Sequence, residues 1–291
     1  MKKPTRNIIK NQKLNIIHFN CRGIGCEERL YELEKSFEKV KWDVIGLSEV
    51  RKMGEKLIKR KNNNYLYFFG ETIGYRGTGF YINRRIIDII IKIEGVTERI
   101  SLMKVELSRK VKILIVQVYA PTMDANEEEI EKFYSKLREV YYREKEYYNI
   151  IVGGWNAKIG KADTEKETVG KFGLGTRNRN GDTLVDFALE TRLKIVNTFY
   201  NKKEKHKWTW ISPDENTRNE IDHLLSNDKT IIDNIGVLTG CKFPSDHRPV
   251  RCTISIPQRP RYNNYRNKTE GGNKIINRII PKHKIPEAMS F

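Results

Sequence analysis

The chain has 291 residues, enough for one large domain or two small ones. Lys and Arg exceed Asp and Glu by 18, which favours a polyanionic partner, because a basic side chain placed on a phosphate releases condensed counterions. The sequence contains neither an apolar stretch typical of a secretory signal nor one approaching a membrane span, so we expect an intracellular protein. The four cysteines lack the spacing of a zinc site and the density of a disulfide scaffold.

Short apolar runs predict buried strands along most of the chain, after a polar and basic stretch at 1–13 that we expect to be a flexible arm. The predicted strands cover 14–20, 43–49, 77–85, 86–93, 101–107, 111–121, 149–154, 193–198, 207–212, 220–226 and 248–256. Apolar residues at helical spacing predict amphipathic helices over 27–40, 126–145 and 181–192.

This order of elements fits neither a regular alternation of strand and helix nor an all-β chain. Two β-sheets packed face to face, with helices outside, would fit it. We therefore predict an α/β domain over 14–257. Residues 258–291 are rich in Pro, Asn, Arg and Lys without apolar periodicity, so we expect a basic linker or disordered tail.

Polar residues follow several of the predicted strands directly. They are Asn20, Glu49, Tyr119, Asn156, Asp222, Asp246 and His247. Strand ends at one edge of a sheet converge, so polar groups placed there can build a single site. Each residue also has an ordinary interpretation on its own, such as a solvated carboxylate for Glu49 or a structural Asp–His pair for Asp246 and His247.

Phosphodiester hydrolysis is the chemistry that would use the whole set. A hard divalent cation prefers oxygen ligands, which Glu49 with Asn20 could supply. A histidine can handle the proton of an attacking water or stabilise charge on the phosphate, and Asp222 or Asp246 would orient it. Amide and phenol groups can hold phosphate oxygens without adding negative charge.

The order of motifs resembles the endonuclease/exonuclease/phosphatase superfamily. It is most similar to the endonuclease domain of non-LTR (LINE-type) retrotransposons and to the group called craniofacial development protein 2-like. The motifs span about 14–256 and read NIIHFNCRGI, DVIGLSEVRK, GTGFYI, VQVYAPT, VGGWNAKIG, FGLGTRNRNGDTLVDFALE, KWTWISP, EIDHLL and SDHRPV. The resemblance implies a four-layer α/β sandwich and a phosphodiesterase site that uses Mg²⁺, or alternatively Mn²⁺.

The resemblance also implies roles for individual positions. Asn20, Glu49 and Asp246 match residues of the metal site, and the Tyr119 position matches a tyrosine that contacts phosphate. Asn156 matches the asparagine of the G-D-x-N motif.

Two further residues complete this set. The resemblance implies that His247 contacts the scissile phosphate and that Asp222 is the acid paired with it. Thr209 and Trp210 match a T-W turn for which we expect a structural role.

One position departs from the pattern, because Gly154 occupies the place of the aspartate in the G-D-x-N motif. That aspartate is the residue assigned to orient or deprotonate the attacking water, and losing a positioned general base costs roughly 10²–10⁴-fold in rate. We therefore expect a DNA-nicking enzyme with impaired activity. The alternatives are a catalytically inactive DNA-binding remnant and, less favoured by the basic charge, a phosphatase or lipid phosphodiesterase.

Basic residues that follow Glu49 and precede Trp208 are candidates for a rim that contacts DNA phosphates. They are Arg51, Lys52, Lys59, Arg60, Lys61, Lys205 and Lys207. We expect DNA as the partner, a monomer, no membrane association and no small-molecule cofactor. A protein that acts on DNA would work in the nucleus.

Overall fold

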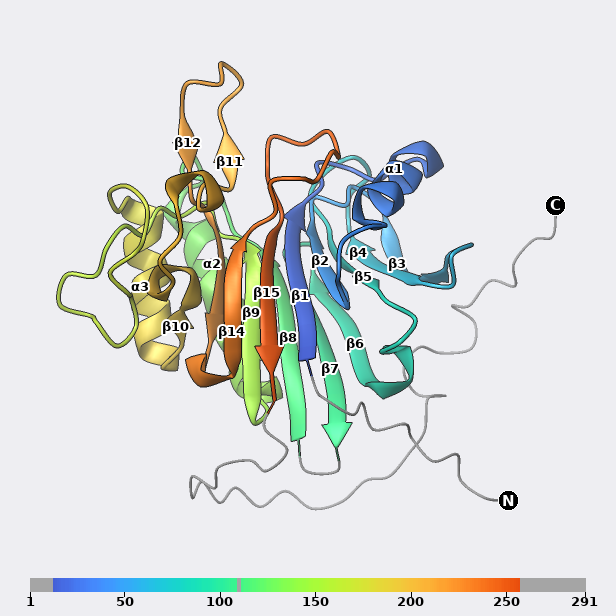
Figure 1. Ribbon diagram of the computed structural model, residues 1–291, viewed down its shortest axis with the longest axis horizontal. Helices are drawn as coiled ribbons and strands as arrows, with labels where there is room; N and C mark the ends of the chain where they lie inside the picture. Colours follow the sequence, from blue (N-terminus) through green and yellow to red (C-terminus); the bar gives the residue numbers. More distant parts are fainter. Residues whose placement is uncertain (1–12, 109–110, 257–291) are drawn as a thin grey trace.

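The computed structural model describes residues 13–108 and 111–256 (Figure 1). Most of the predicted N-terminal arm and the whole predicted tail lie outside the described residues. Lys13, expected at the end of the arm, is instead the first residue of strand β1 (Lys13–Asn20).

Two mixed β-sheets form the centre of the molecule, and a separate two-stranded ribbon stands beside them. The seven-stranded sheet has the order β14 (Ile232–Val237), β15 (Val250–Ser255), β1, β2 (Val44–Ser48), β5 (Thr78–Ile82), β4 (Tyr65–Gly70) and β3 (Gly54–Lys59). The six-stranded sheet has the order β10 (Lys194–Ile195), β13 (Asp222–Ser226), β9 (Tyr148–Gly154), β8 (Val111–Tyr119), β7 (Ile100–Ser108) and β6 (Ile90–Thr97). The ribbon pairs β11 (Trp210–Ile211) with β12 (Arg218–Asn219).

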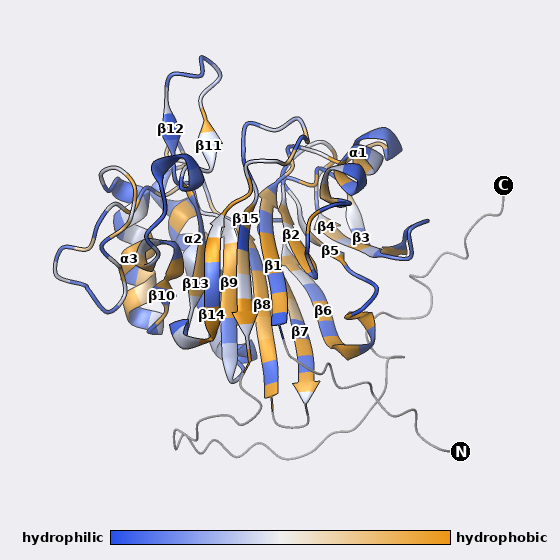
Figure 2. Cartoon of the chain, in the orientation of Figure 1, coloured by the Kyte–Doolittle hydropathy of each residue, from blue (hydrophilic) through white to orange (hydrophobic). Residues whose placement is uncertain are grey.

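The helices cover the outer faces of the two sheets. They are α1 (Glu27–Phe37), α2 (Glu127–Glu144) and α3 (Arg179–Thr191), and short 3-10 turns lie at Ile87–Ile89, Val196–Phe199, Glu204–His206 and Lys229–Ile231. One apolar cluster joins α1 to the seven-stranded sheet, a second joins α2 and α3 to the six-stranded sheet, and a third fills the space between the sheets. The predicted four-layer α/β sandwich is thus confirmed (Figures 1 and 2).

The helix starts follow from local sequence. The side chain of Asn126 accepts a hydrogen bond from the backbone N–H of Glu129, and Asn178 caps α3 in the same way through Gly181. Asparagine favours this position because its oxygen satisfies an N–H group that the helix itself leaves without a partner.

Four strands were absent from the sequence prediction. Strand β3 lies at the edge of its sheet, where exposed and half-buried positions alternate. Charged residues hide this pattern in the sequence, which therefore suggested a basic rim. Strands β4, β12 and β14 were not predicted either. The predicted strand at 193–198 is two residues of β10 followed by a 3-10 turn.

Alternation along the central strands brings polar side chains to one end of the space between the sheets. On β1, Leu14 and Ile16 lie in the inter-sheet core, so His18 and Asn20 face the same way with a period of two. Strand β8 repeats the arrangement, since Ile113 and Ile115 are followed on the same face by Gln117 and Tyr119.

Strands β2, β9 and β13 add one residue each to this end, namely Ser48, Gly154 and Asp222. Residues 154 and 222 are directly paired in the ladder between β9 and β13. The inter-sheet core therefore changes from apolar to polar at the edge where Asn20 ends β1 and Glu49 follows β2.

Candidate active site

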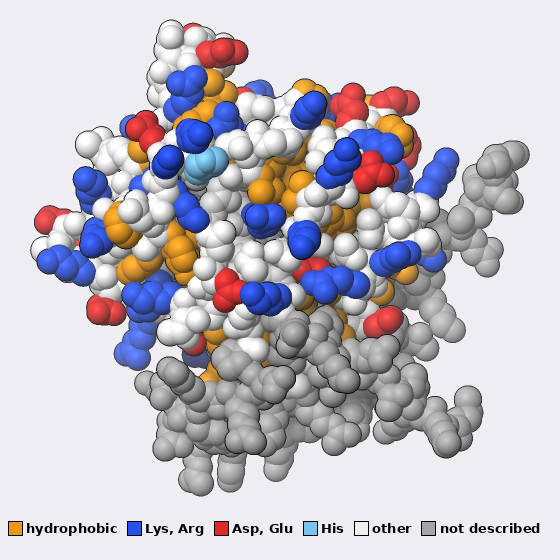
Figure 3. All heavy atoms as spheres, viewed as in Figure 1, with side chains coloured by type: hydrophobic (Ala, Val, Ile, Leu, Met, Phe, Trp, Pro, Cys, Tyr) orange, Lys and Arg blue, Asp and Glu red, His pale blue; other side chains and the backbone are white. Residues whose placement is uncertain are grey.

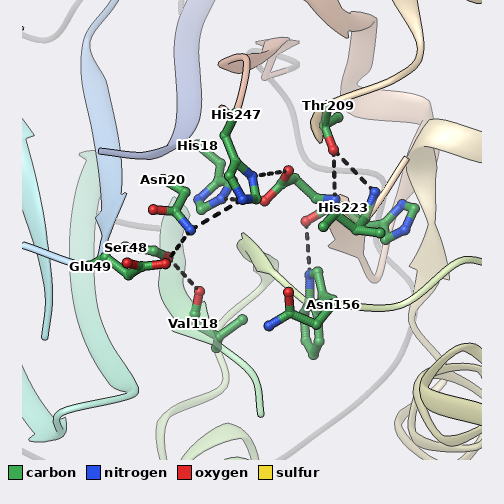
Figure 4. A network of polar contacts seen from close by, with 12 residues as sticks. His18, Asn20, Ser48, Glu49, Val118, Asn156, Thr209, His223 and His247 are labelled. Atoms are coloured by element: carbon green, nitrogen blue, oxygen red, sulfur yellow. Dashed lines mark hydrogen bonds and ion pairs between the residues drawn. The ribbon is translucent and has the colours of Figure 1, made fainter. Parts of the chain in front are cut away.

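A chain of hydrogen bonds links the ends of β1 and β2 to the loop before β15 (Figure 4). Asn20 Nδ2 donates to Glu49 Oε1 at 2.8 Å and lies 3.5 Å from His247 Nε2. The Asn20 oxygen accepts from the backbone N–H of Arg22 at 3.2 Å, which fixes the orientation of the amide. Three residues from separate parts of the sequence thus converge, as predicted.

Glu49 is held as a carboxylate. Burial alone would raise its pKa, but hydrogen bonds from Asn20, Arg51 and Tyr119 outweigh burial and lower the pKa below its usual value. The contact from Arg51 Nη2 to Glu49 Oε2 measures 2.6 Å. Glu49 and Arg51 both adopt a left-handed backbone, with φ of 54° and 55°. Such strain in non-glycine residues is concentrated at functional sites.

Asp222 and His247 form a buried pair, with Asp222 Oδ2 lying 2.9 Å from His247 Nδ1. Burial would raise the pKa of Asp222, but the neighbouring His247 and His18 lower it well below its usual value. Burial would lower the pKa of His247, whereas the Asp222 charge outweighs burial and raises it. The Nδ1–H of the ring therefore donates to Asp222, which leaves Nε2 facing Asn20 and the site.

Asp246 is the residue before His247, and its hydrogen-bond partners differ from those of Asp222. Its Oδ2 accepts from Arg22 Nη1 at 2.7 Å and from Trp210 Nε1 at 3.0 Å. Its Oδ1 is buried and has no hydrogen-bond partner among the described residues. The charges of Asp246 and Glu49 both act on His247, and two carboxylates near one point suit a hard cation. In the described part of the chain, no group of three or more His, Cys, Asp and Glu side chains is arranged to hold a metal ion, so the amide of Asn20 would have to contribute.

Tyr119 and Asn156 end β8 and follow β9. Burial, and next the Glu49 charge, raise the pKa of Tyr119, so its hydroxyl stays protonated and can donate. Asn156 has a left-handed backbone, with φ of 51°, and its Nδ2 donates to the Ala120 carbonyl at 2.9 Å. Figure 4 shows Asn156 across the site from Asn20 and Glu49.

The glycine at 154 lies directly beside the Asp222–His247 pair. A Cβ placed on Gly154 would be 3.2 Å from Asp222 Oδ1 and 3.6 Å from the Tyr119 ring. The residues predicted to surround this position do so, and the position itself carries no side chain.

Thr209 has a structural role that matches its prediction. Its Oγ1 accepts hydrogen bonds from the backbone N–H groups of Ile221 and Asp222, at 3.1 and 3.2 Å, and so fixes the start of β13. Trp210 does more than we expected, because its indole N–H holds Asp246 and its backbone pairs with His247.

Three residues of the site were missed by the sequence reasoning. His18 Nε2 lies 3.1 Å from Asp222 Oδ1, Gln117 Oε1 lies 3.2 Å from His18 Nδ1, and Arg22 binds Asp246. His18 and Gln117 each lie two residues before a predicted site residue. The period of two in a strand could therefore have identified them.

The residues of the predicted basic rim fall into two groups, which lie at opposite ends of the sheet. Lys59 pairs with Tyr65 at the start of β4, and Tyr65 pairs with Ile82, which pairs with Val44 at the start of β2. Glu49 follows the other end of β2, so Lys59 and its neighbours Arg60 and Lys61 lie at the far end of the sheet from the site. Arg60 is also bound to Glu27 and Glu34.

The other rim residues lie at the site's own edge of the sheets. Arg51 binds Glu49, and Lys52 donates to the Gly25 carbonyl at 3.0 Å. Lys205 is exposed, and its carbonyl accepts from Arg248, the residue after His247. Lys207 is half-buried and donates to the Phe172 carbonyl. Figure 3 shows Lys and Arg side chains spread over the visible face.

A cavity of about 450 Å³ opens beside Glu49 and Tyr119. Its lining includes four arginines, which are Arg22, Arg51, Arg76 and Arg99. Arg99 stacks over the Tyr119 ring at 5.3 Å and also binds Glu129. The lining also contains Glu49, Asp124 and Glu129, and each of the four arginines is paired with a carboxylate, so the cavity wall is mixed in charge.

The chain is similar to proteins of the endonuclease/exonuclease/phosphatase superfamily, as the sequence predicted, and it shares their two-sheet fold. A family model described as endonuclease-reverse transcriptase matches residues 113–251. Craniofacial development protein 2 of Bos taurus is 28% identical over 224 residues, which cover 76% of this chain and 37% of that protein. The chain thus spans little more than a third of the length of that relative. Exodeoxyribonuclease III of Haemophilus influenzae is 23% identical over 275 residues, covering 81% of this chain and 98% of that protein.

Solved structures share the fold at low sequence identity. AP endonuclease of Leishmania major has a TM-score of 0.63 at 14% identity, covering 84% of this chain and 88% of that one. The endonuclease domain of the telomere-specific non-LTR retrotransposon TRAS1 has a TM-score of 0.56 at 15% identity, covering 83% and 98%. Within the described residues, no helix has the length and apolar character needed to cross a membrane.

Proposed function

We propose that the chain is a retrotransposon-type DNA endonuclease domain that nicks DNA by phosphodiester hydrolysis, with a rate reduced by the glycine at 154. The observation that carries the proposal is the convergence of Glu49, Asn20, His247 and Asp222 through contacts of 2.8 to 3.5 Å. The excess of 18 basic residues favours a nucleic acid as substrate.

Glu49, Asp246 and Asn20 would hold a divalent cation, with Mg²⁺ the expected ion. Such an ion supplies Lewis-acid stabilisation of charge on the phosphoryl and leaving oxygens. Arg22 and Arg51 now bind the same two carboxylates. The arginines would therefore have to share the carboxylates with the ion or move toward the phosphates.

The chain's own residues would bind and orient the phosphodiester. His247 Nε2 faces the site and can exchange a proton with a phosphate oxygen or water, while Asp222 fixes its tautomer from behind. The Asn156 amide would donate to a non-bridging oxygen, and the protonated Tyr119 hydroxyl would do the same by turning from Glu49, to which it now donates. No carboxylate projects from 154 to orient the attacking water, so we expect a loss of roughly 10²–10⁴-fold in rate.

A plasmid-nicking assay tests this proposal. With Mg²⁺ we expect slow conversion of supercoiled to open-circular DNA by the wild type, none with EDTA, and none above background by His247→Ala. The impairment would be refuted if neither Gly154→Asp nor the double variant Gly154→Asp with His18→Ser nicked DNA faster than the wild type.

A DNA-binding module without turnover is the second candidate, because the glycine at 154 and the basic charge both suit it. Salt-dependent DNA affinity together with nicking no faster than His247→Ala at any Mg²⁺ concentration would favour this candidate. Hydrolysis of a phosphoinositide but not DNA would instead indicate a lipid phosphodiesterase.

A further inference from the structure

The buried imidazole of His18 takes no part in the function proposed above. It lies on the inter-sheet face of β1, and its side chain is 2% exposed. Its Nδ1 is 3.2 Å from Gln117 Oε1 and its Nε2 is 3.1 Å from Asp222 Oδ1. His18 therefore connects the first sheet to two strands of the second.

The contact between His18 and Gln117 has a fixed direction. Gln117 Nε2 donates to Ser48 Oγ at 2.8 Å and to the Val118 carbonyl at 2.9 Å, so the amide oxygen faces His18 and accepts from it. Gly46 makes room for this arrangement, because a Cβ at that position would lie 2.1 Å from Gln117 Oε1. The residues that surround His18 in space thus hold its imidazole ring with Nδ1 toward Gln117.

His18 and His247 hold the Asp222 carboxylate from its two sides. His18 contacts Oδ1 at 3.1 Å, and His247 contacts Oδ2 at 2.9 Å. A carboxylate bound at both oxygens cannot rotate away from either partner. His18 therefore fixes the plane in which Asp222 meets His247.

The position that lacks a side chain adjoins the same oxygen. A Cβ on Gly154 would lie 3.2 Å from Asp222 Oδ1 and 3.8 Å from His18 Nε2. A carboxylate at 154 would thus bring a second negative charge against buried Asp222 and compete for the His18 ring. A polar side chain can reach Asp222 Oδ1 either from β1 or from position 154 at the end of β9. In this chain, His18 on β1 provides that contact.

We propose that His18 replaces, from the opposite sheet, the polar group that Gly154 lacks, and that it is a positioning residue holding Asp222 against His247. The role of this pair in hydrolysis rests on the function proposed above. The coupling between positions 18 and 154 does not, so it is testable in a protein without turnover.

The coupling is tested by a double-mutant cycle of thermal unfolding, with His18→Ser, Gly154→Asp and the two combined. We expect the change in Tm caused by Gly154→Asp to differ by at least about 3 °C between the wild-type and the His18→Ser backgrounds, because residues in contact are energetically coupled. Additive Tm changes would overturn the proposal whether or not the protein cleaves DNA.

The positioning role is tested by nicking kinetics. We expect His18→Ala to lower kcat about tenfold or more with KM unchanged, and His18→Gln to recover much of the loss, because its amide can still donate to Asp222. The matched control is His223→Gln, since His223 is equally buried beside Asp222 but contacts the Ala157 carbonyl and should leave kcat unchanged.

The outcomes separate the two proposals. Equal kcat for wild type and His18→Ala would overturn the positioning role, and so would equal losses in His18→Ala and His223→Gln. A wild type that does not nick DNA, combined with strong coupling in the thermal cycle, would refute the proposed function and retain the replacement of the 154 side chain by His18. A large gain in nicking from Gly154→Asp alone would confirm the impairment and overturn the replacement.

Discussion

Arg22 and Arg51 give this site an internal source of positive charge. Each binds one carboxylate that we assign to a cation, at 2.7 Å for Asp246 and 2.6 Å for Glu49. A guanidinium and a divalent cation compete for the same oxygens, so each arginine should weaken metal binding in the absence of DNA.

At the scale of the residue, we predict that Arg51→Ala binds Mn²⁺ more tightly than the wild type. A partly exposed ion pair is worth up to about 1 kcal/mol, so we expect an increase of about fivefold in affinity, measured by calorimetry or electron paramagnetic resonance without DNA. Arg60→Ala is the control, because Arg60 binds Glu27 and Glu34 at the far end of β3. Equal or weaker affinity in Arg51→Ala would show that no competition takes place.

The sequence could identify the acidic and amide residues of the site but not all their partners. Asn20, Glu49 and Asp222 stand at strand ends, where a polar residue after an apolar run is conspicuous. His18 lies within an apolar run, and its meaning depends on Asp222 and Gln117, which are 204 and 99 residues away in sequence. No local pattern predicts which strand of the other sheet lies opposite.

At the scale of the element, α2 is fixed to the second sheet by a buried charge at its end. Glu144 accepts from Lys92 Nζ at 2.8 Å, from Lys104 Nζ at 3.1 Å and from Arg143 Nε at 2.8 Å. Burial would raise the pKa of Glu144, but these hydrogen bonds lower it to about 2. Lys92 and Lys104 come from β6 and β7, so the carboxylate joins the helix to two strands.

Glu144 should therefore stabilise the fold in a pH-dependent way. Because its pKa is lower in the folded chain, its contribution is present above about pH 4.5 and is lost as the pH falls toward 2. We predict that Glu144→Gln lowers the free energy of unfolding by up to about 3 kcal/mol at pH 7 and by much less at pH 2.5, as measured by urea denaturation. Glu128→Gln, an exposed change on the same helix, should leave the free energy of unfolding nearly unchanged at both pH values. A loss for Glu144→Gln that is equal at both pH values would contradict the assignment.

The sequence predicted helices and strands accurately where one face or the whole of the element is buried. Helices α1, α2 and α3 were predicted from apolar residues at helical spacing, and β1, β2, β8 and β9 from short, mainly apolar runs. Strand β3 alternates charged and half-buried residues at a sheet edge, so its composition resembles that of a solvated loop. The order of strands in each sheet depends on long-range pairing, so the sequence did not predict it, and the family resemblance implied only the four-layer architecture.

At the scale of the whole molecule, the positive charge is unevenly distributed along the chain. Residues 1–12 contain four Lys or Arg and no acid, and residues 257–291 contain eight Lys or Arg and two acids. Ten of the 18 excess positive charges therefore lie in these two terminal segments. The position of a basic residue relative to the site, rather than the total charge, should decide whether it contacts DNA near the scissile phosphate.

The last prediction compares two exposed lysines by their place in the fold. Lys205 lies beside Arg248 at the site's edge, whereas Lys59 lies at the far end of β3. Both substitutions, Lys205→Glu and Lys59→Glu, change the net charge by the same amount. We expect Lys205→Glu to weaken duplex DNA binding severalfold and to reduce the slope of log K against log salt by about 0.9 for each phosphate that the protein no longer neutralises.

Fluorescence anisotropy over a salt series measures both quantities for the two variants in the full chain. If only long-range charge mattered, Lys59→Glu and Lys205→Glu would weaken binding equally, and that result would exclude a defined phosphate-contacting rim. A larger effect of Lys59→Glu would instead show that the DNA extends along the sheet to the far end of β3, as the basic stretch after Glu49 suggests. A larger effect of Lys205→Glu would place the DNA backbone at the edge where His247, Asp222 and the glycine at 154 meet.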